Sequence, residues 1–517
     1  MKKRILVAAV ATTSLMLTAC GNDDKKQEAI SVSLPTEAKA NQLDAQSYDA
    51  AMPVYSAVYE PLVQYDKKSG VKPKLAEKWS VDSEGKVYTF HLKKDVKFSD
   101  GSPLNAEAVK FSIERAKAMN PETTVETLKQ LDKVTVDDQH TVSIHLKTPS
   151  NQVLNELTQV RPLRIMSPHA VEGEKTKGKF KKAIGTGALM VDKTGKEQTS
   201  MKPNPHFNND HPVKYHLNFQ TIEDGDSRNA AVQSGSIDVT GGALGMLTEQ
   251  QIKSHQDQKD LHVEDAPSTV SHFIAFNPKQ EVLKNKAIRQ AISESIDTKH
   301  LSDKEIKGIF QKDVQFVNEN NQEKHVFDVK AAKKALKSEG YEQNKDGIFE
   351  KEGKPLQFNL VIQTAEFPNW KDKAEQVQSD LKKAGIKVQI KTLDTQSYYD
   401  TLWTKKDYDM IFYRTYSDAL MPYQFMNSVF KNADNQPGVL ANDPTLSKQL
   451  EAFPKELSKG DQQQAFNEIF KHFNKGYYGV PIAYPNETFV TSVRIENFKF
   501  SGLTDAPIDY EKLKVKQ

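Results

Sequence analysis

Histidine and cysteine are the side chains best suited to metal binding, and this sequence uses them unevenly. Of its 517 residues, 13 are histidine and one is cysteine. Three of the histidines, His206, His211 and His216, lie five positions apart in PHFNNDHPVKYH. A five-residue step does not place three rings on one helix face, and Pro205 and Pro212 oppose a continuous helix. We therefore predict a surface turn that leads into a strand here, and not a metal site.

Other patterns that carry chemistry are absent from the sequence. It has no HExxH pair, no paired-cysteine motif, no P-loop and no serine-centred nucleophile elbow. The GTG at 185–187 is too short to predict a phosphate site. Lys and Arg total 71 against 69 for Asp and Glu, so the net charge of +2 gives no reason to expect a nucleic acid partner. We predict that the protein is not an enzyme.

The single cysteine, Cys20, follows an apolar run at the N-terminus. Met1–Arg4 reads MKKR, and residues 5–19 are uncharged and mostly apolar. This run is shorter than the roughly 20 residues needed to cross a bilayer. A basic start followed by an apolar run and small residues is typical of a secretory signal peptide. Residues 21–29, GNDDKKQEA, have almost no apolar side chains and predict a solvated tether.

Residues 17–20, Leu-Thr-Ala-Cys, resemble the lipobox of bacterial lipoproteins, in which the cysteine becomes the N-terminus and carries lipid. Acyl chains contribute about 0.8 kcal/mol per buried methylene, and more than one chain is needed for stable anchoring. The alternative is an ordinary signal peptide with an incidental Cys20. With Cys20 lipidated, the mature chain has no thiol for disulfides, metal sites or nucleophilic catalysis. We predict a body held on the extracytoplasmic face of the cell membrane.

Apolar periodicity predicts several strands and one strand–helix–strand unit. Alternation predicts strands at 87–94 (VYTFHLKK) and 141–147 (TVSIHLK). LQFNLVIQT, at 356–364, predicts another strand. Apolar residues at 370, 374, 377, 381 and 384 then share one helical face, and Gly385 takes the expected C-terminal cap position. IKVQIKTL, at 386–393, predicts a second strand, so we expect a parallel crossover.

The size of the chain and its remaining helices indicate a mixed α/β protein with more than one lobe. Helices are predicted at 287–296, at 328–340 and at 462–473. About 490 mature residues exceed what one hydrophobic core usually supports. We therefore predict two or more lobes with at least one parallel element.

Three segments together resemble a known family. Residues 72–115 (KPKLAEKWSVDSEGKVYTFHLKKDVKFSDGSPLNAEAVKFSIER) resemble the family 5 solute-binding proteins of ABC importers, which carry oligopeptides, dipeptides and nickel complexes. AVYEPLVQYD, at 57–66, precedes this block at the family's usual distance. Residues 273–297 resemble the point where such chains enter their second lobe. The resemblance covers nearly the whole mature chain.

Within this family, the sequence is most similar to the nickel-binding branch. LNELTQVRPLRIMSPHAV (154–171) resembles that branch's segment around an Arg-Pro pair. Residues 408–429 resemble its cleft-lining strand and loop, and residues 479–514 resemble its return to the first lobe. Dipeptide receptors share part of this pattern, so peptide remains the alternative cargo.

The resemblance implies an α/β, two-lobe, periplasmic-binding-protein-like fold of type II, in the large peptide/nickel-receptor cluster, with hinge closure. The implied domains are a signal peptide at 1–19, the lipidated cysteine and tether at 20–29, lobe I at 30–268 and 483–517, and lobe II at 269–482. The two crossings are expected near 266–276 and 480–485. The ligand is expected between the lobes.

The resemblance also implies ligand-binding residues. Arg161 of the Arg-Pro segment is expected to bind carboxylates of a chelator around the metal, because guanidinium offers a two-pronged donor. Arg164 is the alternative arginine. Met52 is placed in the cleft and Tyr416 stands where relatives carry a tryptophan. Further candidates follow in the cleft strand and loop: Arg414, Asp418 and Tyr423.

The sequence departs from the branch where relatives bind the metal directly. NSVFKNADNQPGV, at 427–439, lacks the histidine of relatives, and Leu420 replaces a tyrosine. The segment 116–131 lacks the expected tryptophan and histidine. Three alternatives follow. The metal arrives fully chelated, for example by free histidine; another side chain, such as His272, supplies a ligand; or the cargo is not a metal.

We therefore predict the substrate-binding lipoprotein of an ABC importer, which captures nickel, or a similar divalent ion such as cobalt, as a complex with a small carboxylate-bearing chelator. Its partners would be the permease and ATPase subunits, with a lipid anchor as its only membrane contact, and it would act as a monomer without a cofactor. The alternative is a di- or oligopeptide receptor in which Asp418 binds the amino end. An adhesin or signalling receptor that has lost transport is a third possibility.

Overall fold

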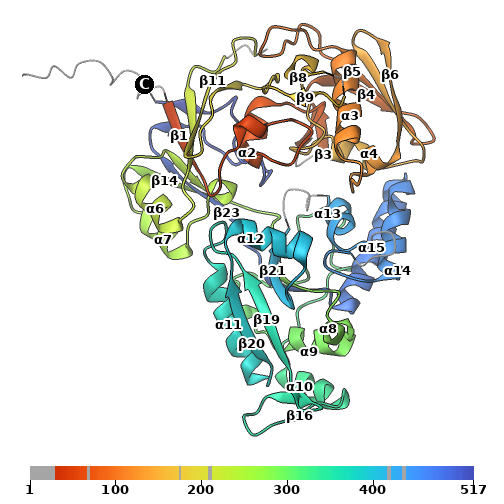
Figure 1. Ribbon diagram of the computed structural model, residues 1–517, viewed down its shortest axis with the longest axis vertical. Coiled ribbons are helices and arrows are strands. Elements are labelled where there is room, and N and C mark those ends of the chain that lie inside the picture. Colours follow the sequence, from red (N-terminus) through yellow and green to blue (C-terminus); the bar gives the residue numbers. More distant parts are fainter. Residues whose placement is uncertain are drawn as a thin grey trace, which may run out of the picture.

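The computed structural model describes residues 29–66, 70–173, 176–207, 212–415, 421–432 and 438–516, and shows two lobes. Figure 1 places lobe I above lobe II. The predicted signal peptide and Cys20 lie outside the described residues. Within the described ranges, no helix is both long enough and apolar enough to span a membrane.

The first sheet of lobe I has seven strands in the order β10-β11-β12-β1-β13-β23-β14. In chain order these are β1 (Ala29–Leu34), β10 (Leu189–Lys193), β11 (Gln198–Pro203), β12 (His216–Thr221), β13 (Val239–Gly241), β14 (Leu261–Ala266) and β23 (Glu487–Ser492). β1 runs parallel to β12 and β13, and β23 is antiparallel to β13 and β14. The C-terminal return of the chain therefore completes the sheet that its first described residues begin.

The second sheet of lobe I has the order β4-β5-β7-β6 and packs on one helix. Its strands are β4 (Ala76–Val81), β5 (Val87–Leu92), β6 (Leu131–Asp138) and β7 (Thr141–Leu146). The predicted strands at 87–94 and 141–147 are thus confirmed, and the alternate residues Tyr88, Phe90 and Leu92 are buried. The helix is α3 (Ala106–Met119), which is capped by Asn105.

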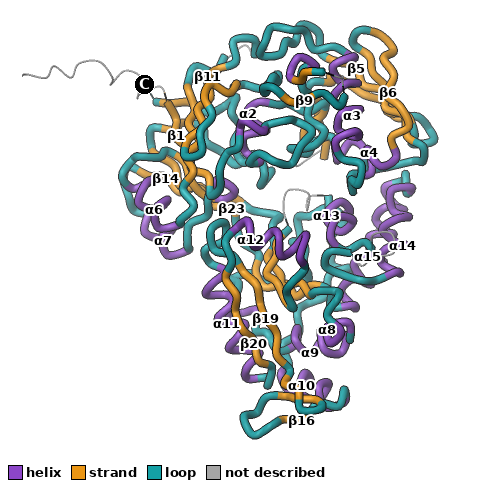
Figure 2. Tube along the Cα trace, in the orientation of Figure 1, coloured by secondary structure: helices purple, strands orange, loops and turns teal. Residues whose placement is uncertain are grey.

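Lobe II is built on a five-stranded sheet of order β20-β19-β21-β15-β22 (Figure 2). Its strands are β15 (His272–Phe276), β19 (Gln357–Ile362), β20 (Lys387–Thr392), β21 (Met410–Arg414) and β22 (Gly479–Ala483). β19 and β20 are parallel and are joined by α11 (Trp370–Lys383), as the sequence predicts. α11 packs on both strands and ends before Gly385, whose φ of 85° only glycine adopts easily.

Longer helices surround this sheet. They are α9 (Lys286–Glu294), α10 (Val329–Ser338), α13 (Pro422–Val429), α14 (Pro444–Ala452) and α15 (Lys459–Gly476). The three helices predicted from periodicity are confirmed as α9, α10 and α15. α15 begins earlier than predicted because Ser458 caps it, accepting a hydrogen bond from the Asp461 amide at 3.1 Å.

The remaining elements are short. The helices are α2 (Met52–Val58), α4 (Glu126–Gln130), α5 (Val153–Glu156), α6 (Gly225–Gln233), α7 (Glu249–His255), α8 (Glu281–Lys284) and α12 (Thr395–Asp400). The strands are β2 (Val63–Asp66), β3 (Gly70–Pro73), β8 (Val171–Glu172), β9 (Lys179–Phe180), β16 (Glu342–Gln343), β17 (Phe349–Lys351), β18 (Lys354–Pro355), β24 (Ile495–Glu496) and β25 (Lys514–Val515).

Each lobe has its own hydrophobic core. The core of lobe I draws on residues between 30 and 244 and again between 489 and 513. The core of lobe II lies between 273 and 482. The chain passes from lobe I to lobe II after β14 and returns after β22, so two neighbouring segments form the covalent connection. Two separately packed bodies joined by short segments can rotate as rigid units.

Candidate ligand-binding cleft

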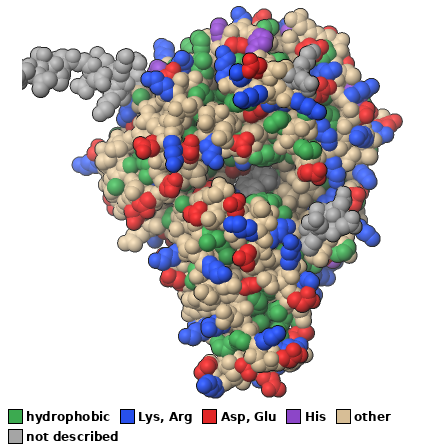
Figure 3. All heavy atoms as spheres, in the orientation of Figure 1, with side chains coloured by type: hydrophobic (Ala, Val, Ile, Leu, Met, Phe, Trp, Pro, Cys, Tyr) green, Lys and Arg blue, Asp and Glu red, His purple; other side chains and the backbone are tan. Residues whose placement is uncertain are grey.

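A cavity of about 1230 Å³ lies between the lobes. Figure 3 shows the surface hollowed where the lobes meet. Lobe I contributes the loop after β1, residues 48–53, 119–125 and 158–161, and the C-terminal return at 503–505. Lobe II contributes 365–367, 394–396, Tyr399 and the end of β21. This volume exceeds the roughly 300–1,000 Å³ of most small-molecule sites, so a hydrated or multi-part ligand fits.

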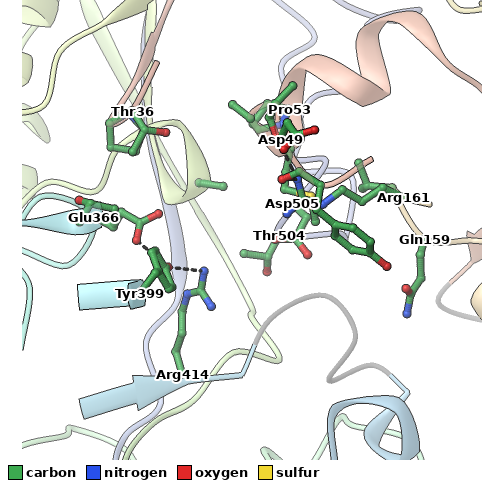
Figure 4. A pocket seen from close by; sticks show the side chains of 18 of the residues that line it. Thr36, Asp49, Pro53, Gln159, Arg161, Glu366, Tyr399, Arg414, Thr504 and Asp505 are labelled. Carbon is green, nitrogen blue, oxygen red and sulfur yellow. Dashed lines mark hydrogen bonds between the residues drawn. The ribbon is translucent and has the colours of Figure 1, made fainter. Parts of the chain in front are cut away.

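Arg161 points from lobe I into this space (Figure 4). Its Nη1 donates to the carbonyls of Tyr48 and Ala50, at 2.8 and 3.0 Å, and its guanidinium lies 4.9 Å from the centre of the Tyr48 ring. No described carboxylate forms an ion pair with Arg161, and its Nε is buried without a hydrogen-bond partner among the described residues. The guanidinium is therefore oriented by lobe I and retains donors for a carboxylate.

Arg164 lies in the interior of lobe I and does not line the cavity. Its Nε donates to the Gln159 carbonyl and its Nη1 to the Tyr59 carbonyl, each at 2.9 Å. Burial lowers the pKa of Arg164 to about 10. Of the two arginines that the sequence left open, only Arg161 reaches the cleft in this structure.

Met52 also lines the cavity, at the first position of α2. It packs partly against the core of lobe I. Tyr48, four positions earlier, is 49% exposed and forms part of the same wall, although sequence analysis did not single it out. Its position beside Arg161 depends on the fold, because 113 residues separate the two.

The facing wall of lobe II carries a connected polar group (Figure 4). Arg414, at the end of β21, donates to the Tyr399 hydroxyl at 3.4 Å and lies 5.2 Å from the Phe367 ring centre. The Tyr399 hydroxyl donates to Glu366 Oε2 at 2.7 Å. Burial raises the pKa of Tyr399 well above its ordinary value, so the hydroxyl remains protonated.

Arg414 lines the cleft, where the sequence places it, but sequence analysis missed Tyr399 and Glu366. A signal was present for Glu366, since it follows the parallel strand β19, and the carboxyl ends of such strands form ligand crevices. Tyr423 is buried in lobe II, where its ring stacks on Phe453 at 5.2 Å, and does not line the cavity. Tyr416 and Asp418 lie outside the described residues, as does Leu420.

His272 is enclosed by aromatic rings next to the first crossing. Its ring meets those of Phe367 and Trp370 edge-on, at 5.4 and 5.5 Å, and its Nδ1 accepts the Trp370 indole N–H at 3.2 Å. Burial lowers the pKa of His272 to about 3, so it is neutral, and the proton then sits on Nε2. Neither ring nitrogen has a free lone pair for a metal ion, so this arrangement does not fit the prediction of His272 as a metal ligand.

The other histidines of the sequence pattern give no metal site either. His206 and His216 are exposed, His216 begins β12, and His211 lies outside the described residues. Within the described ranges, no group of three or more His, Cys, Asp or Glu side chains could hold a metal ion.

Among the described residues of the cavity wall, carboxylates outnumber cations. The acidic residues are Glu37, Asp49, Glu122, Glu223, Glu366, Asp394, Glu487 and Asp505, and the cations are Lys39, Arg161 and Arg414. Glu487, at the second crossing, is fully buried, and its Oε1 accepts from Thr504 Oγ1 at 3.0 Å. Burial, with the charge of Asp505, raises the pKa of Glu487 to about 7. Such a wall favours neutral or zwitterionic cargo over a polyanion.

Comparison with known proteins agrees with this geometry. The nickel-binding periplasmic protein of Escherichia coli is 26% identical over 99% of this chain and 98% of its own. The probable D,D-dipeptide-binding periplasmic protein DdpA of E. coli is 27% identical over 72% of each chain. NikA of Brucella suis, solved in complex with Fe(III)-EDTA, superposes with a TM-score of 0.85 at 25% identity, covering 94% of this chain and all of NikA.

The family model for the middle region of family 5 matches residues 70–437, most of the chain, which spans both lobes and the first crossing. The cleft between lobes, the two neighbouring crossings and this match agree on the same fold. The chain belongs to the bacterial extracellular solute-binding proteins of family 5.

Proposed function

We propose that the protein captures nickel, or a similar divalent ion such as cobalt, as a complex with a small carboxylate-bearing chelator such as histidine. The observation that carries this proposal is Arg161, whose guanidinium is held in the cleft without a carboxylate partner among the described residues. The described ranges hold no group of three or more His, Cys, Asp or Glu side chains that could bind a metal ion, and in this proposal the metal arrives already chelated.

The relatives support a chelated metal as cargo. One is a nickel-binding protein, and another was solved with iron held by EDTA, a carboxylate-bearing chelator. The cavity of about 1230 Å³ has room for a metal with its ligands, and its acidic wall suits a zwitterionic chelator. Amino groups of such a chelator would face Glu366 or Asp394, while its carboxylate meets Arg161.

We further propose that the protein is a lipoprotein that delivers its cargo to the permease and ATPase of an ABC importer, and that it binds without catalysing a reaction. Cys20 would carry the lipid. Cargo that binds better to closed lobes would shift the population toward the closed form, which the permease would recognise. A Cys20→Ser chain is expected in the soluble fraction of fractionated cells, whereas the unaltered chain is expected with the membranes.

Peptide binding is the second candidate. The relative DdpA is a probable dipeptide-binding protein, and the acidic wall could accept the amino end of a peptide. Asp418 is the sequence-based candidate for this role. A peptide would also use Arg161, because its carboxyl end needs the same kind of partner.

Thermal unfolding with different ligands separates the two candidates. The ligands are nickel alone, nickel with excess L-histidine, the same pair for cobalt and zinc, and a pool of di- to pentapeptides. A ligand at 100 times its Kd stabilises by about 2.7 kcal/mol, a shift of several degrees. A shift with nickel and histidine, lost in Arg161→Ala, supports the chelate. A shift with peptides alone contradicts it.

A further inference from the structure

The lobes touch again on the side of the cleft that lies away from the crossings. In Figure 1 the crossing strands β14 and β23 lie at the left of the cleft, whereas α13, α14 and α15 lie beneath α4 at the right. Here the turn at 453–456, which follows α14, meets residue 151 of lobe I. These contacts involve no covalent connection, so they can form and break as the lobes rotate.

Asn151 makes three hydrogen bonds across this gap. Its Nδ2 donates to the carbonyls of Phe453 and Glu456, at 3.0 and 2.7 Å, and its backbone N–H donates to the Pro454 carbonyl at 2.8 Å. One lobe I residue thus binds the whole turn at 453–456. An alanine at this position would retain only the backbone bond.

Two further amide contacts lie nearer the cavity. Gln159 and Gln424, which both line it, exchange reciprocal side-chain hydrogen bonds, and Gln424 Nε2 lies 2.9 Å from Gln159 Oε1. Asn427 Nδ2 donates to the Thr124 carbonyl at 2.9 Å. All of these bonds join neutral amides to carbonyl oxygens. They are short-range and directional, and therefore require the lobes to be closed to within hydrogen-bond distance.

A contact on the opposite flank behaves differently. Arg228 of lobe I donates to the Ala365 carbonyl of lobe II at 3.0 Å, beside the crossings. Points near the rotation axis move little when two rigid bodies separate, while points far from it move most. Opening of the cleft would therefore break the amide contacts on the far side first.

We propose that Asn151, Gln159 and Thr124 of lobe I, with Gln424, Asn427 and residues 453–456 of lobe II, form a clasp that sets the closed population of the cargo-free protein. Asn151 is its principal positioning residue, since it makes three of the six bonds and does not line the cavity. The clasp bonds join protein atoms to protein atoms, so we expect the clasp to act with any cargo. It controls how often the cleft opens and how much closure free energy the cargo must supply.

The test compares two asparagines with the same chemistry. Asn151→Ala removes two side-chain bonds to carbonyls between the lobes. Asn277→Ala removes two bonds of the same kind within lobe II, from Nδ2 to the carbonyls of Lys406 and Tyr408 at 2.8 and 2.7 Å. Spin labels at K133C and K448C, on exposed positions of β6 and α14, report the distance between lobes in cargo-free protein that also carries C20S.

Since one net hydrogen bond changes an equilibrium by about 2- to 12-fold, the closed-to-open ratio is expected to fall about tenfold or more in Asn151→Ala. Asn277→Ala should lower the unfolding midpoint and leave the distance distribution unchanged. Gln424→Ala should open the cleft by a smaller factor. An unchanged distribution in Asn151→Ala, or equal opening in Asn277→Ala, would overturn the proposal.

Discussion

Arg161 and Arg164 are three positions apart, yet their guanidinium groups have opposite surroundings. Arg161 faces the cleft, while Arg164 satisfies buried carbonyls inside lobe I. We expect Arg164→Ala to lower the free energy of unfolding by about 2–4 kcal/mol, because it leaves buried acceptors unpaired. Arg161→Ala should change it by less than about 1 kcal/mol. Urea unfolding measures both.

The same pair gives opposite results for binding. Loss of a charge-assisted bidentate contact in Arg161→Ala should weaken nickel–histidine binding by about 100-fold, measured by titration calorimetry. Arg161→Lys keeps the positive charge but loses the bidentate hydrogen-bond geometry of the guanidinium, and is expected to recover only part of the affinity. Equal affinity in Arg161→Ala and the unaltered protein would exclude Arg161 from the ligand site.

Glu487 makes stability depend on pH. Its pKa is raised from 4.5 to about 7 in the folded protein, so between these values the folded state holds a proton that the unfolded state has released. Its contribution to stability therefore falls as the pH rises from 4.5 to 7 and is constant above that. Compared with the unaltered protein, the free energy of unfolding of Glu487→Gln should rise by about 2–3 kcal/mol between pH 4.5 and 8. A pH-independent difference in unfolding free energy would contradict the assignment.

At the scale of elements, the turn after α11 depends on a glycine. A Cβ on Gly385 would lie 2.7 Å from the Gly347 carbonyl oxygen, in addition to the strain of a positive φ. Gly385→Ala is expected to lower the free energy of unfolding by about 2 kcal/mol or more. Gly353 has a similar φ of 72°, but a Cβ added there would have no neighbouring atom within 4 Å. Gly353→Ala should therefore lower the free energy of unfolding by only about 1 kcal/mol. Similar losses in both variants would mean that packing around α11 is not the cause.

At the scale of the whole molecule, the separate cores predict independent unfolding. Each lobe has its own core, and the lobes are joined by two crossings and by scattered hydrogen bonds and ion pairs. We expect cargo-free protein to unfold in two calorimetric transitions, because the contacts between lobes are few compared with those within them. Cargo that bridges the lobes should bring the transitions together. One two-state transition without cargo would show that the lobes are a single cooperative unit.

Periodicity predicted much of the fold, because secondary structure depends on neighbours within a few residues. The strands at 87–94 and 141–147, the parallel pair around α11 and the three helices are confirmed. The start of α15 was missed, because its first turn is polar and is defined by the Ser458 cap rather than by apolar spacing.

The candidate site was less accessible to sequence reasoning. Arg161, Met52 and Arg414 were identified through the family resemblance, and the structure places all three in the cleft. Glu366, Tyr399 and Glu487 were missed, because only the folding of distant segments brings them to the cleft wall. His272 lies beside the first crossing, but its Nδ1 accepts the Trp370 indole N–H, a contact that the sequence does not reveal.

The sequence by itself determined the class of protein: its family and its α/β elements. Those properties are encoded in contiguous stretches, whose apolar period and motif residues can be recognised without knowing their neighbours. Only the tertiary structure decided which arginine faces the cleft, which histidine is enclosed, and that Asn151 meets a turn 302 residues later. These contacts depend on which side chains folding brings together. Contacts between distant segments produce no periodic pattern in the sequence, so the sequence does not reveal them.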